Sequence, residues 1–371
     1  MSSVQTTEIC VIGAGPAGLK AAISARDMGA RVTIVDSGRT LGGQLVKQTH
    51  KFFGSRGQFA GMRGIDIAKV LSDELLKDPS RVDVLYDSQV AGFYGDGILA
   101  IEKDDCIRFL KPERVVCATG ARERMLLFEN NDLPGVYGAG AVQTLMNVYG
   151  VRPGKRVLMV GAGNIGLIVS YQLIQAGVDV ACVLEAMPHV GGYRVHAAKI
   201  KRLGVPILTS HTIKAAHGTD VVQGATAVAL DSRFQPVPGS ERFFEVDTVC
   251  LAVGLSPLTE LLWQAGCKMG YVPELGGYTP LRRDNYETTR MGVFIAGDLA
   301  GIEEATSAMI EGEIAGLAAA KSLGYETCDF EERFNRAKAE LEGMRQGPTG
   351  LKVRQGLAKL MAITERVRAF G

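Results

Sequence analysis

The residues with the clearest chemical meaning lie in two glycine-rich turns, each placed between an apolar run and a helical pattern. The first is Gly13-Ala14-Gly15-Pro16-Ala17-Gly18 and the second is Gly161-Ala162-Gly163-Asn164-Ile165-Gly166. In such a turn the first glycine permits a tight bend, the second lets the backbone approach a diphosphate, and the third lets helix pack on strand. The anion then lies at a helix N-terminus, where N–H groups and the helix dipole favour it. The pattern therefore predicts nucleotide binding at Gly13, Gly15 and Gly18, and again at Gly161, Gly163 and Gly166.

An acidic residue follows each turn at the end of the next apolar run. These residues are Asp36 and Glu185, and a carboxylate at this place can accept hydrogen bonds from a ribose diol. Glu185 would also repel a 2′-phosphate, and no arginine follows it directly, so the second site favours NADH over NADPH. The alternatives are that the second fold is kept for packing, or that it holds another adenine nucleotide.

Repeated strand, turn and helix units must position these residues. The pattern predicts strands over 9–12 and 31–35 around a helix ending near 28, and strands over 157–160 and 180–184 around a helix ending near 176. Strands over 115–117 and 248–251 end in small-residue turns that contain Thr119 and Gly120, and Gly254. A strand from 292 runs into Gly297-Asp298, before a helix over 305–323. We expect an α/β fold with two Rossmann-like, three-layer dinucleotide-binding domains.

Composition excludes several other classes of protein. The 371 residues include 41 Lys plus Arg and 40 Asp plus Glu, which argues against a nucleic-acid binder because such a protein needs an excess of positive charge. Residues 157–178 carry no charge and are numerous enough to span a bilayer, but their spaced glycines, Asn164 and Gln172 favour a buried strand, turn and helix. We therefore expect no transmembrane segment.

The seven cysteines form no C-x-x-C pair, which removes the simplest dithiol, zinc-ribbon and iron-sulfur sites. Their odd number and their places in apolar runs suggest reduced core residues of a cytoplasmic protein, and the polar N-terminal residues give no signal peptide. The five histidines have no metal-ligand spacing, so we expect no metal site.

The order of four motifs resembles that of the two-dinucleotide-domain FAD/NAD(P) oxidoreductases of the pyridine nucleotide-disulfide oxidoreductase superfamily. The motifs are Gly13 to Gly18 with Asp36, Gly42-Gly43-Gln44, Ala118-Thr119-Gly120 and Gly297-Asp298. The resemblance implies FAD in a first, discontinuous domain, 1–122 with 256–323, and NAD(H) in a second domain inserted over 123–255. It places Gly43 and Gln44 along the FAD, and Asp298 on the ribityl chain. The amides near Ala305 would face the flavin pyrimidine edge.

The run Leu41-Gly42-Gly43-Gln44-Leu45 is also similar to low-molecular-weight thioredoxin reductases, but the stretch 133–141, where those enzymes carry a redox C-x-x-C, has no cysteine. Dithiol chemistry is therefore excluded as the main activity. The runs 133–136, 139–144 and 153–157 resemble a narrower branch: the FAD/nucleotide-binding subunits of heteromeric amine and imino-acid dehydrogenases and oxidases. Sarcosine oxidase alpha, opine oxidase A, hydrogen cyanide synthase B and L-proline dehydrogenase alpha belong to that branch.

This resemblance implies an FAD-dependent oxidoreductase subunit that exchanges electrons with NADH or with a second flavoprotein subunit that oxidises the amine. An iron-sulfur centre, if the assembly has one, must come from another chain, because residues 324–371 contain only Cys328. Two alternatives stay open. One is a stand-alone NADH-dependent reductase of a quinone, ferredoxin or other acceptor, and the other is a non-catalytic nucleotide-binding assembly subunit.

No side-chain acid or base is evident, and the weak candidates His50 and Lys47 follow the Gly-Gly-Gln turn. The favoured alternative is that both are surface loop residues near the cofactor entrance. The segment 324–371 predicts two helices, over 329–344 and 351–369. Its apolar residues either pack on their own domain or dock a partner subunit; they are Leu351, Val353, Leu357, Leu360, Met361 and Val367.

Overall fold

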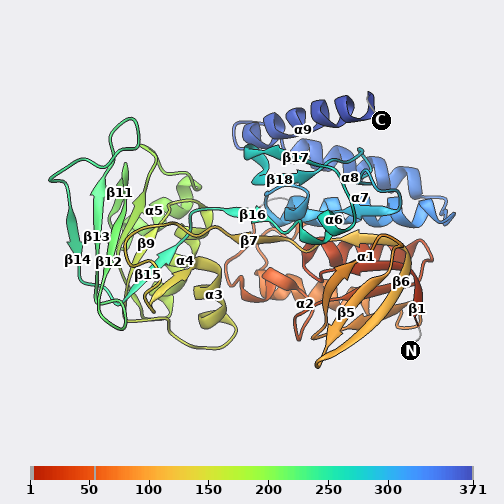
Figure 1. The fold of residues 1–371 in the computed structure, drawn as a ribbon, viewed down its shortest axis with the longest axis horizontal. Coiled ribbons are helices and arrows are strands. Elements are labelled where there is room, and N and C mark those ends of the chain that lie inside the picture. The colour runs from red at the N-terminus through yellow and green to blue at the C-terminus, as the bar shows by residue number, and fades with distance from the viewer. Residues whose placement is uncertain (1–3, 54–55, 370–371) are drawn as a thin grey trace. The chain divides into compact units, whose positions relative to one another are not determined.

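The computed structural model describes residues 4–53 and 56–369, which divide into two compact units (Figure 1). The first unit contains the chain up to 46, residues 51–122 and everything from 256 onward, and the second contains 47–50 and 123–255. The chain passes between them four times, after residues 46, 50, 122 and 255. The last two crossings lie in short strands that pair with each other, β7 (Ala121–Glu123) and β16 (Leu255–Pro257).

A mixed sheet forms the centre of the first unit. Among the described residues its order is β3-β2-β1-β6-β5-β4, with β19 also paired to β6. The pairs β3-β2, β2-β1, β1-β6 and β6-β19 are parallel. Strand β5 is antiparallel to β6, and β4 is antiparallel to β5. The bounds are β1 Gln5–Ile12, β2 Val32–Val35, β3 Val82–Leu85, β4 Gln89–Phe93, β5 Leu99–Lys103, β6 Cys106–Cys117 and β19 Val293–Ile295.

Helices cover this sheet, and two of them pack unusually closely. A Cβ on Gly312 would lie 2.1 Å from the carbonyl oxygen of Ala17, and one on Gly316 would lie 2.2 Å from that of Ala21. Only glycine at these places lets helix α7 approach helix α1. The helices of this unit are α1 Pro16–Asp27, α2 Gly64–Leu75, α6 Glu260–Gln264, α7 Ala305–Ser322, α8 Phe330–Met344 and α9 Leu351–Ala369. Short 3₁₀ turns cover Gly43–Lys47, Arg56–Gln58, Pro273–Leu275 and Gly297–Leu299.

The second unit repeats the parallel arrangement on a smaller scale. Its sheet has the order β11-β10-β9-β15-β8, and every pairing in it is parallel. An antiparallel sheet of β12, β13 and β14 adjoins it in the chain. The bounds are β8 Val136–Gly138, β9 Arg156–Val160, β10 Asp179–Glu185, β11 Ile207–Thr209, β12 His211–His217, β13 Gly224–Ala229, β14 Arg242–Phe244, β15 Thr248–Leu251, α3 Ala139–Asn147, α4 Asn164–Gln175 and α5 Arg194–Arg202.

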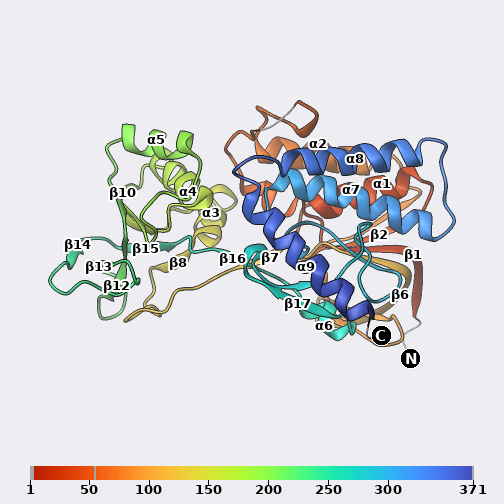
Figure 2. The ribbon, with the colours of Figure 1, turned by 90° about the horizontal axis from the view of Figure 1, so that it is seen from above.

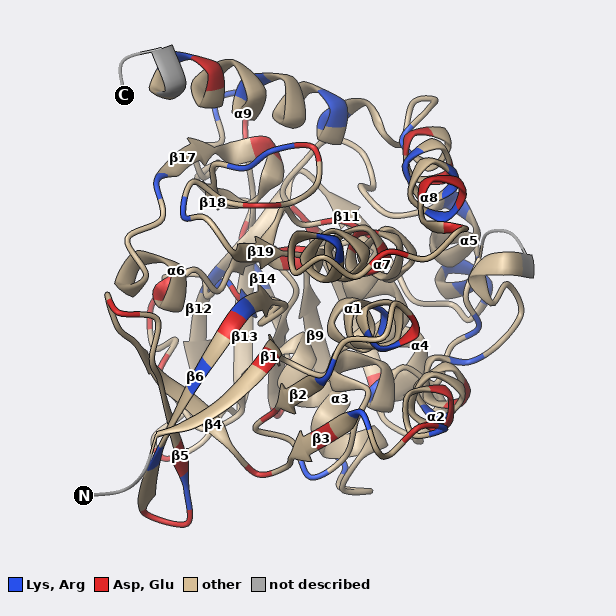
Figure 3. Ribbon diagram, turned by 90° about the vertical axis from the view of Figure 1, so that its right-hand side faces the viewer, with Lys and Arg blue, Asp and Glu red and all other residues tan. Residues whose placement is uncertain are grey.

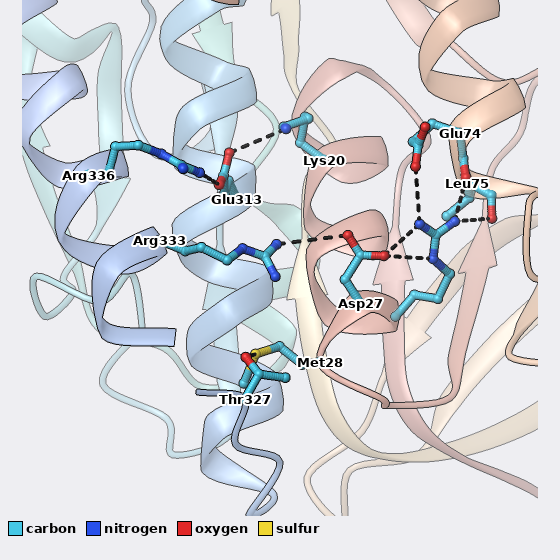
Figure 4. Close-up of polar contacts among 10 residues, drawn as sticks. Lys20, Asp27, Met28, Glu74, Leu75, Glu313, Thr327, Arg333 and Arg336 are labelled. Carbon is cyan, nitrogen blue, oxygen red and sulfur yellow. Dashed lines mark hydrogen bonds and ion pairs between the residues drawn. The ribbon is translucent and has the colours of Figure 1, made fainter. Parts of the chain in front are cut away.

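The two C-terminal helices pack on the first unit. Figures 1 and 2 show α8 beside α7, which in turn lies beside α1, and α8 carries charges of both signs (Figure 3). From α8, Arg333 reaches Asp27 at 3.9 Å and Arg336 reaches Glu313 at 3.5 Å (Figure 4). The ammonium of Lys20 on α1 lies 3.3 Å from the same Glu313.

The apolar face expected on α9 is covered by its own unit. Leu360 is fully buried against Val272, Leu275 and Leu281 of the hairpin β17 (Met269–Val272) and β18 (Gly277–Pro280) and its flanks. Val353, Leu357 and Val367 pack around the same cluster, whereas Leu351 stays exposed. Of the two uses considered for this face, packing within the chain is the one observed. The predicted α/β fold class is confirmed.

Candidate nucleotide-binding sites

The first glycine turn is built by its own backbone contacts. A Cβ on Gly13, whose φ is +98°, would lie 2.4 Å from the carbonyl oxygen of Ala118, and one on Gly18 would lie 1.8 Å from that of Gly13. A Cβ on Gly15, by contrast, would meet no atom of the described residues within 4 Å. Close packing therefore explains why positions 13 and 18 are glycine. The space beside Gly15 fits an approaching diphosphate.

The second turn has the same construction. A Cβ on Gly161, with φ +110°, would lie 2.3 Å from the oxygen of Ala252, and one on Gly166 would lie 2.0 Å from that of Gly161. Around Gly163 no atom in the described part of the chain comes within 4 Å of a Cβ placed there. Gly15 and Gly163 are the N-caps of α1 and α4, so each helix begins at an open backbone N-terminus suited to an anion.

The two acidic residues hold their turns in matching ways. Asp36 accepts hydrogen bonds from the N–H of Ala14 (2.5 Å) and of Gly38 (2.7 Å). Glu185 accepts from Ala162 (2.9 Å) and Met187 (2.9 Å). Each carboxylate thus orders the glycine turn and the loop after its own strand, and it is held in the position where a ribose would be recognised.

The first unit brings most of the predicted FAD residues to the N-terminus of α1. A Cβ on Gly43 would lie 2.7 Å from Cα of Gly15, and one on Gly297 would lie 2.8 Å from Cβ of Ala17. Gln44 is exposed and lies in the 3₁₀ turn Gly43–Lys47. The hydroxyl of Thr119 donates a hydrogen bond to the carbonyl of Leu258, and the N–H of Leu258 donates one to the carbonyl of Gly120. Ala305 begins α7 after the loop that contains Asp298.

Asp298 lies in an electrostatically unusual place. Burial, followed by the nearby carboxylates of Glu311, Glu303 and Glu304, raises its pKa to about 7, although the backbone of Glu303 favours the charged form. A carboxyl group that holds its proton near neutral pH can both donate and accept a hydrogen bond. This suits a partner such as a polyol chain, where hydroxyl groups offer both functions.

A second glycine pair was missed in the sequence. Gly192 donates its N–H to the carbonyl of Ala162 at 2.9 Å, as Gly42 does to Ala14 at 2.9 Å. A Cβ on Gly192 would lie 2.9 Å from the carbonyl carbon of Gly163. Spacing could have revealed the pair to within one position, because Gly192 follows Glu185 by seven positions and Gly42 follows Asp36 by six. The duplication therefore includes this loop.

The two weak catalytic candidates belong to the second unit. Lys47 donates to the carbonyl of Gly140 (3.1 Å) and contacts the hydroxyl of Thr144 (3.4 Å). Burial lowers its pKa, and the charge of Glu123 opposes that shift. Burial, with the positive charges of His196 and Lys199, lowers the pKa of His50 to about 4. His50 is thus neutral near pH 7, so the imidazolium form that commonly acts as a general acid is disfavoured there.

The cysteines provide no redox pair. Cys10, Cys117 and Cys250 are fully buried, and burial raises the pKa of each thiol, that of Cys10 to about 12. Thiols in this state are poor nucleophiles. Within the residues that the structure describes, no group of three or more His, Cys, Asp or Glu side chains could hold a metal ion, and none of the helices is long and apolar enough to cross a membrane.

Comparison with known proteins supplies an independent view. Residues 7–312 match the family model described as pyridine nucleotide-disulphide oxidoreductase. Opine oxidase A of Agrobacterium tumefaciens (strain Ach5) is 29% identical over 85% of this chain and 66% of its own length. The alpha subunit of sarcosine oxidase from Corynebacterium sp. (strain P-1) is 28% identical over 86% and 33%. The HcnB subunit of hydrogen cyanide synthase from Pseudomonas protegens is 26% identical over 83% and 69%. The chain thus spans from a third to about two thirds of the length of these relatives.

Solved structures share the fold. L-proline dehydrogenase from P. horikoshii superposes with a TM-score of 0.67 at 22% identity, covering 91% of this chain and 60% of its own. Thioredoxin reductase from T. acidophilum gives a TM-score of 0.70, also at 22% identity, and covers 86% of this chain and 99% of its own. The fold of this chain is therefore one already known in solved proteins.

Proposed function

The chain belongs to the pyridine nucleotide-disulphide oxidoreductase family, and from this we propose that it is the FAD-containing subunit of a heteromeric amine or amino-acid dehydrogenase or oxidase. The resemblance inferred from the glycine motifs is confirmed, and the cofactors of the family are FAD and NAD(P). The finer assignment comes from the relatives, which are subunits of opine oxidase, sarcosine oxidase and hydrogen cyanide synthase.

One observation carries the proposal. Two glycine turns of the same construction, each held by an acidic residue, occur in a chain that has no C-x-x-C dithiol. FAD supplies the redox chemistry, since it accepts electrons in pairs and passes them on singly or in pairs. Without a dithiol, the routes that we consider for those electrons are a nicotinamide at the second glycine turn, a cofactor in a partner flavoprotein, or an external acceptor such as a quinone or ferredoxin. An iron-sulfur centre would join such an assembly only on another chain.

The residues of this chain would bind and orient the cofactors. In the first unit, Gly15 and the start of α1 would hold the FAD diphosphate, Asp36 the adenosine ribose, and Asp298 the ribityl hydroxyls. The start of α7 would direct its positive end at the flavin. In the second unit, Gly163 and α4 would hold the NAD diphosphate, with Glu185 on the ribose. We assign these cofactors to 1–122 with 256–323, and to 123–255.

A stand-alone NADH-dependent reductase is the second candidate. The second glycine turn favours it, because the space beside Gly163 is open and Glu185 is held next to the turn. A cytoplasmic location stays a prediction from the sequence. Both candidates require flavin, and they differ in which donor reduces it and in whether a partner subunit is needed.

The test is an anaerobic titration monitored by the visible absorbance of the flavin. The chain is purified alone and co-expressed with a candidate amine-oxidising subunit, then mixed with NADH, sarcosine, proline or an opine. Bleaching by an amine only in the co-expressed sample supports the proposal. Rapid bleaching of the single chain by NADH supports the reductase. Flavin that no donor bleaches indicates an assembly subunit, and a colourless chain that FAD cannot reconstitute overturns all three.

A further inference from the structure

A buried cluster of charged side chains joins the C-terminal segment to the loop that carries Asp298. Glu311 lies inside α7 with its side chain 2% exposed, and Arg345 follows the last residue of α8 with its side chain 11% exposed. One nitrogen of Arg345, Nη2, lies 2.6 Å from Oε1 of Glu311. Charges this deeply buried are costly unless they are paired and hydrogen-bonded, so the geometry of the cluster is closely constrained.

Glu311 fixes one end of the loop 297–304. Its Oε2 accepts the backbone N–H of Gly297 at 2.9 Å, and its Oε1 accepts the hydroxyl of Tyr286 at 2.8 Å. Gly297, with φ +72°, directly precedes Asp298. The carboxylate of Glu311 therefore sets the backbone at the point where the predicted ribityl ligand begins.

Arg345 fixes the other end of the same loop. Its Nε lies 3.1 Å from both carboxylate oxygens of Glu303, and its Nη2 lies 2.5 Å from Oε1. The backbone of Glu303 in turn stabilises the charged form of Asp298. Only a planar guanidinium can bridge Glu303 and Glu311 in this way, since a lysine offers a single point of charge.

Arg345 is itself held by the rest of the C-terminal segment. Its carbonyl accepts a hydrogen bond from the guanidinium of Arg354 on α9, and a Cβ on Gly350 would collide with that carbonyl at 1.9 Å. The family model matches residues 7–312, so Arg345 lies outside the matched residues.

We propose that Arg345 is a positioning residue for the flavin: by bridging Glu303 and Glu311 it fixes both ends of the loop 297–304, and so places Asp298 and the N-terminus of α7 against FAD. This inference rests on the proposed placement of FAD in the first unit. It gives the C-terminal helices a role in cofactor binding within their own chain.

The experiment measures FAD binding to the deflavinated full-length chain by quenching of flavin fluorescence, together with the visible spectrum of the loaded protein. Arg345→Met removes the guanidinium that forms the bridge and keeps an unbranched side chain equivalent to its stem. Arg336→Met is the matched control, because Arg336 lies on α8, the helix that Arg345 follows, and its own side chain is 61% exposed in its ion pair with Glu313. We expect Arg345→Met to weaken FAD binding by about tenfold or more and to alter the flavin spectrum, whereas Arg336→Met binds like wild type.

Arg345→Lys and Glu303→Gln keep the test decisive if Arg345→Met fails to fold. Each retains part of the cluster, and we expect each to weaken FAD binding by about three- to tenfold. A merely structural role would lower the melting temperature of the apoprotein while leaving FAD affinity and spectrum unchanged, and that result would overturn the proposal. If wild type itself binds no FAD, the proposed function fails instead, so the two failures are distinguishable.

Discussion

Asp36 and Glu185 occupy equivalent places in the two units, and each accepts one hydrogen bond from the second residue of its glycine turn and one from the loop after its own strand. Because Asp36 lies in the unit assigned to FAD and Glu185 in the unit assigned to NAD(H), substitutions at the two positions should affect different cofactors. The pair thus provides matched variants for separating the two sites.

Replacing Glu185 with Gln should reduce the preference for NADH. The substitution removes the charge that repels a 2′-phosphate and weakens charge-assisted hydrogen bonds worth about 1.5–3 kcal/mol each. We expect the ratio of the NADPH and NADH dissociation constants to fall by about tenfold or more, measured by quenching of nucleotide fluorescence. Asp36→Asn should leave this ratio unchanged and weaken FAD instead. An unaltered ratio in Glu185→Gln would contradict the assignment of Glu185.

Two alanine substitutions in the second turn should separate binding from folding. Gly163 has φ −71°, which alanine adopts freely, and its Cβ would point into open space. Gly163→Ala should therefore keep its melting temperature and lose about tenfold or more in NADH affinity. Gly166→Ala should be destabilised by about 1–3 kcal/mol, because its Cβ would overlap the carbonyl of Gly161. Undiminished NADH binding by Gly163→Ala would exclude a diphosphate beside this glycine.

Asp298→Asn should stabilise the apoprotein at alkaline pH while weakening FAD binding. The pKa of Asp298 is raised from 3.8 to about 7, so the fold favours the protonated form. That contribution is fully present below about pH 4 and is lost as pH rises through 7. At pH 8 the variant should exceed wild type by about 4 kcal/mol in free energy of unfolding. Urea titrations at pH 5, 7 and 8 check this, and parallel pH profiles would refute it.

The pH dependence contributed by His50 has the opposite direction. Its pKa is lowered from 6.5 to about 4, so the native state favours the neutral ring while the unfolded chain takes up a proton below about 6.5. Stability should therefore fall as pH drops from about 6.5 towards 4, by about 2 kcal/mol from this group. His50→Gln should remove that part of the slope in urea titrations. An identical slope in variant and wild type would show that His50 titrates normally.

The close contact of α1 and α7 should be intolerant of added volume. Gly312→Ala would place a Cβ 2.1 Å from the carbonyl of Ala17, and we expect a loss of about 1–3 kcal/mol in free energy of unfolding. The control is Gly343→Ala on the exposed side of α8, where no atom of the described chain lies within 4 Å. Alanine there should raise stability by about 0.5 kcal/mol. Equal effects at the two glycines would show that α1 and α7 can separate.

Local pattern was sufficient to predict the duplicated part of the fold. Buried parallel strands appear as continuous apolar runs, and the glycine turns with Asp36 and Glu185 punctuate them at fixed spacing. The antiparallel strands β4, β5 and β12 to β14 were not predicted, because short half-buried strands carry a weak alternation. Strand pairing depends on tertiary contacts that local pattern does not contain.

Long-range contacts explain the rest of what sequence reasoning missed. Tyr286, Glu311 and Arg345 lie up to 59 positions apart, and nothing near any one of them indicates that they meet. Lys47 and His50 follow the Gly-Gly-Gln turn in the chain, yet they pack with helices of the second unit. Gly191 and Gly192 were missed for a different reason, since the spacing of the internal repeat in the sequence already pointed to them.

The discontinuous first unit has a consequence for the order in which the chain folds during synthesis. The segment that forms the second unit is complete once residue 255 has left the ribosome, because residues 47–50 precede it. Helix α1 must wait for Gly312 and Gly316, almost 300 positions later, before its packing surface exists. The nascent chain therefore carries a completed second unit while the first unit still lacks α7, so we expect the proposed FAD site to form only once α7 has been synthesised.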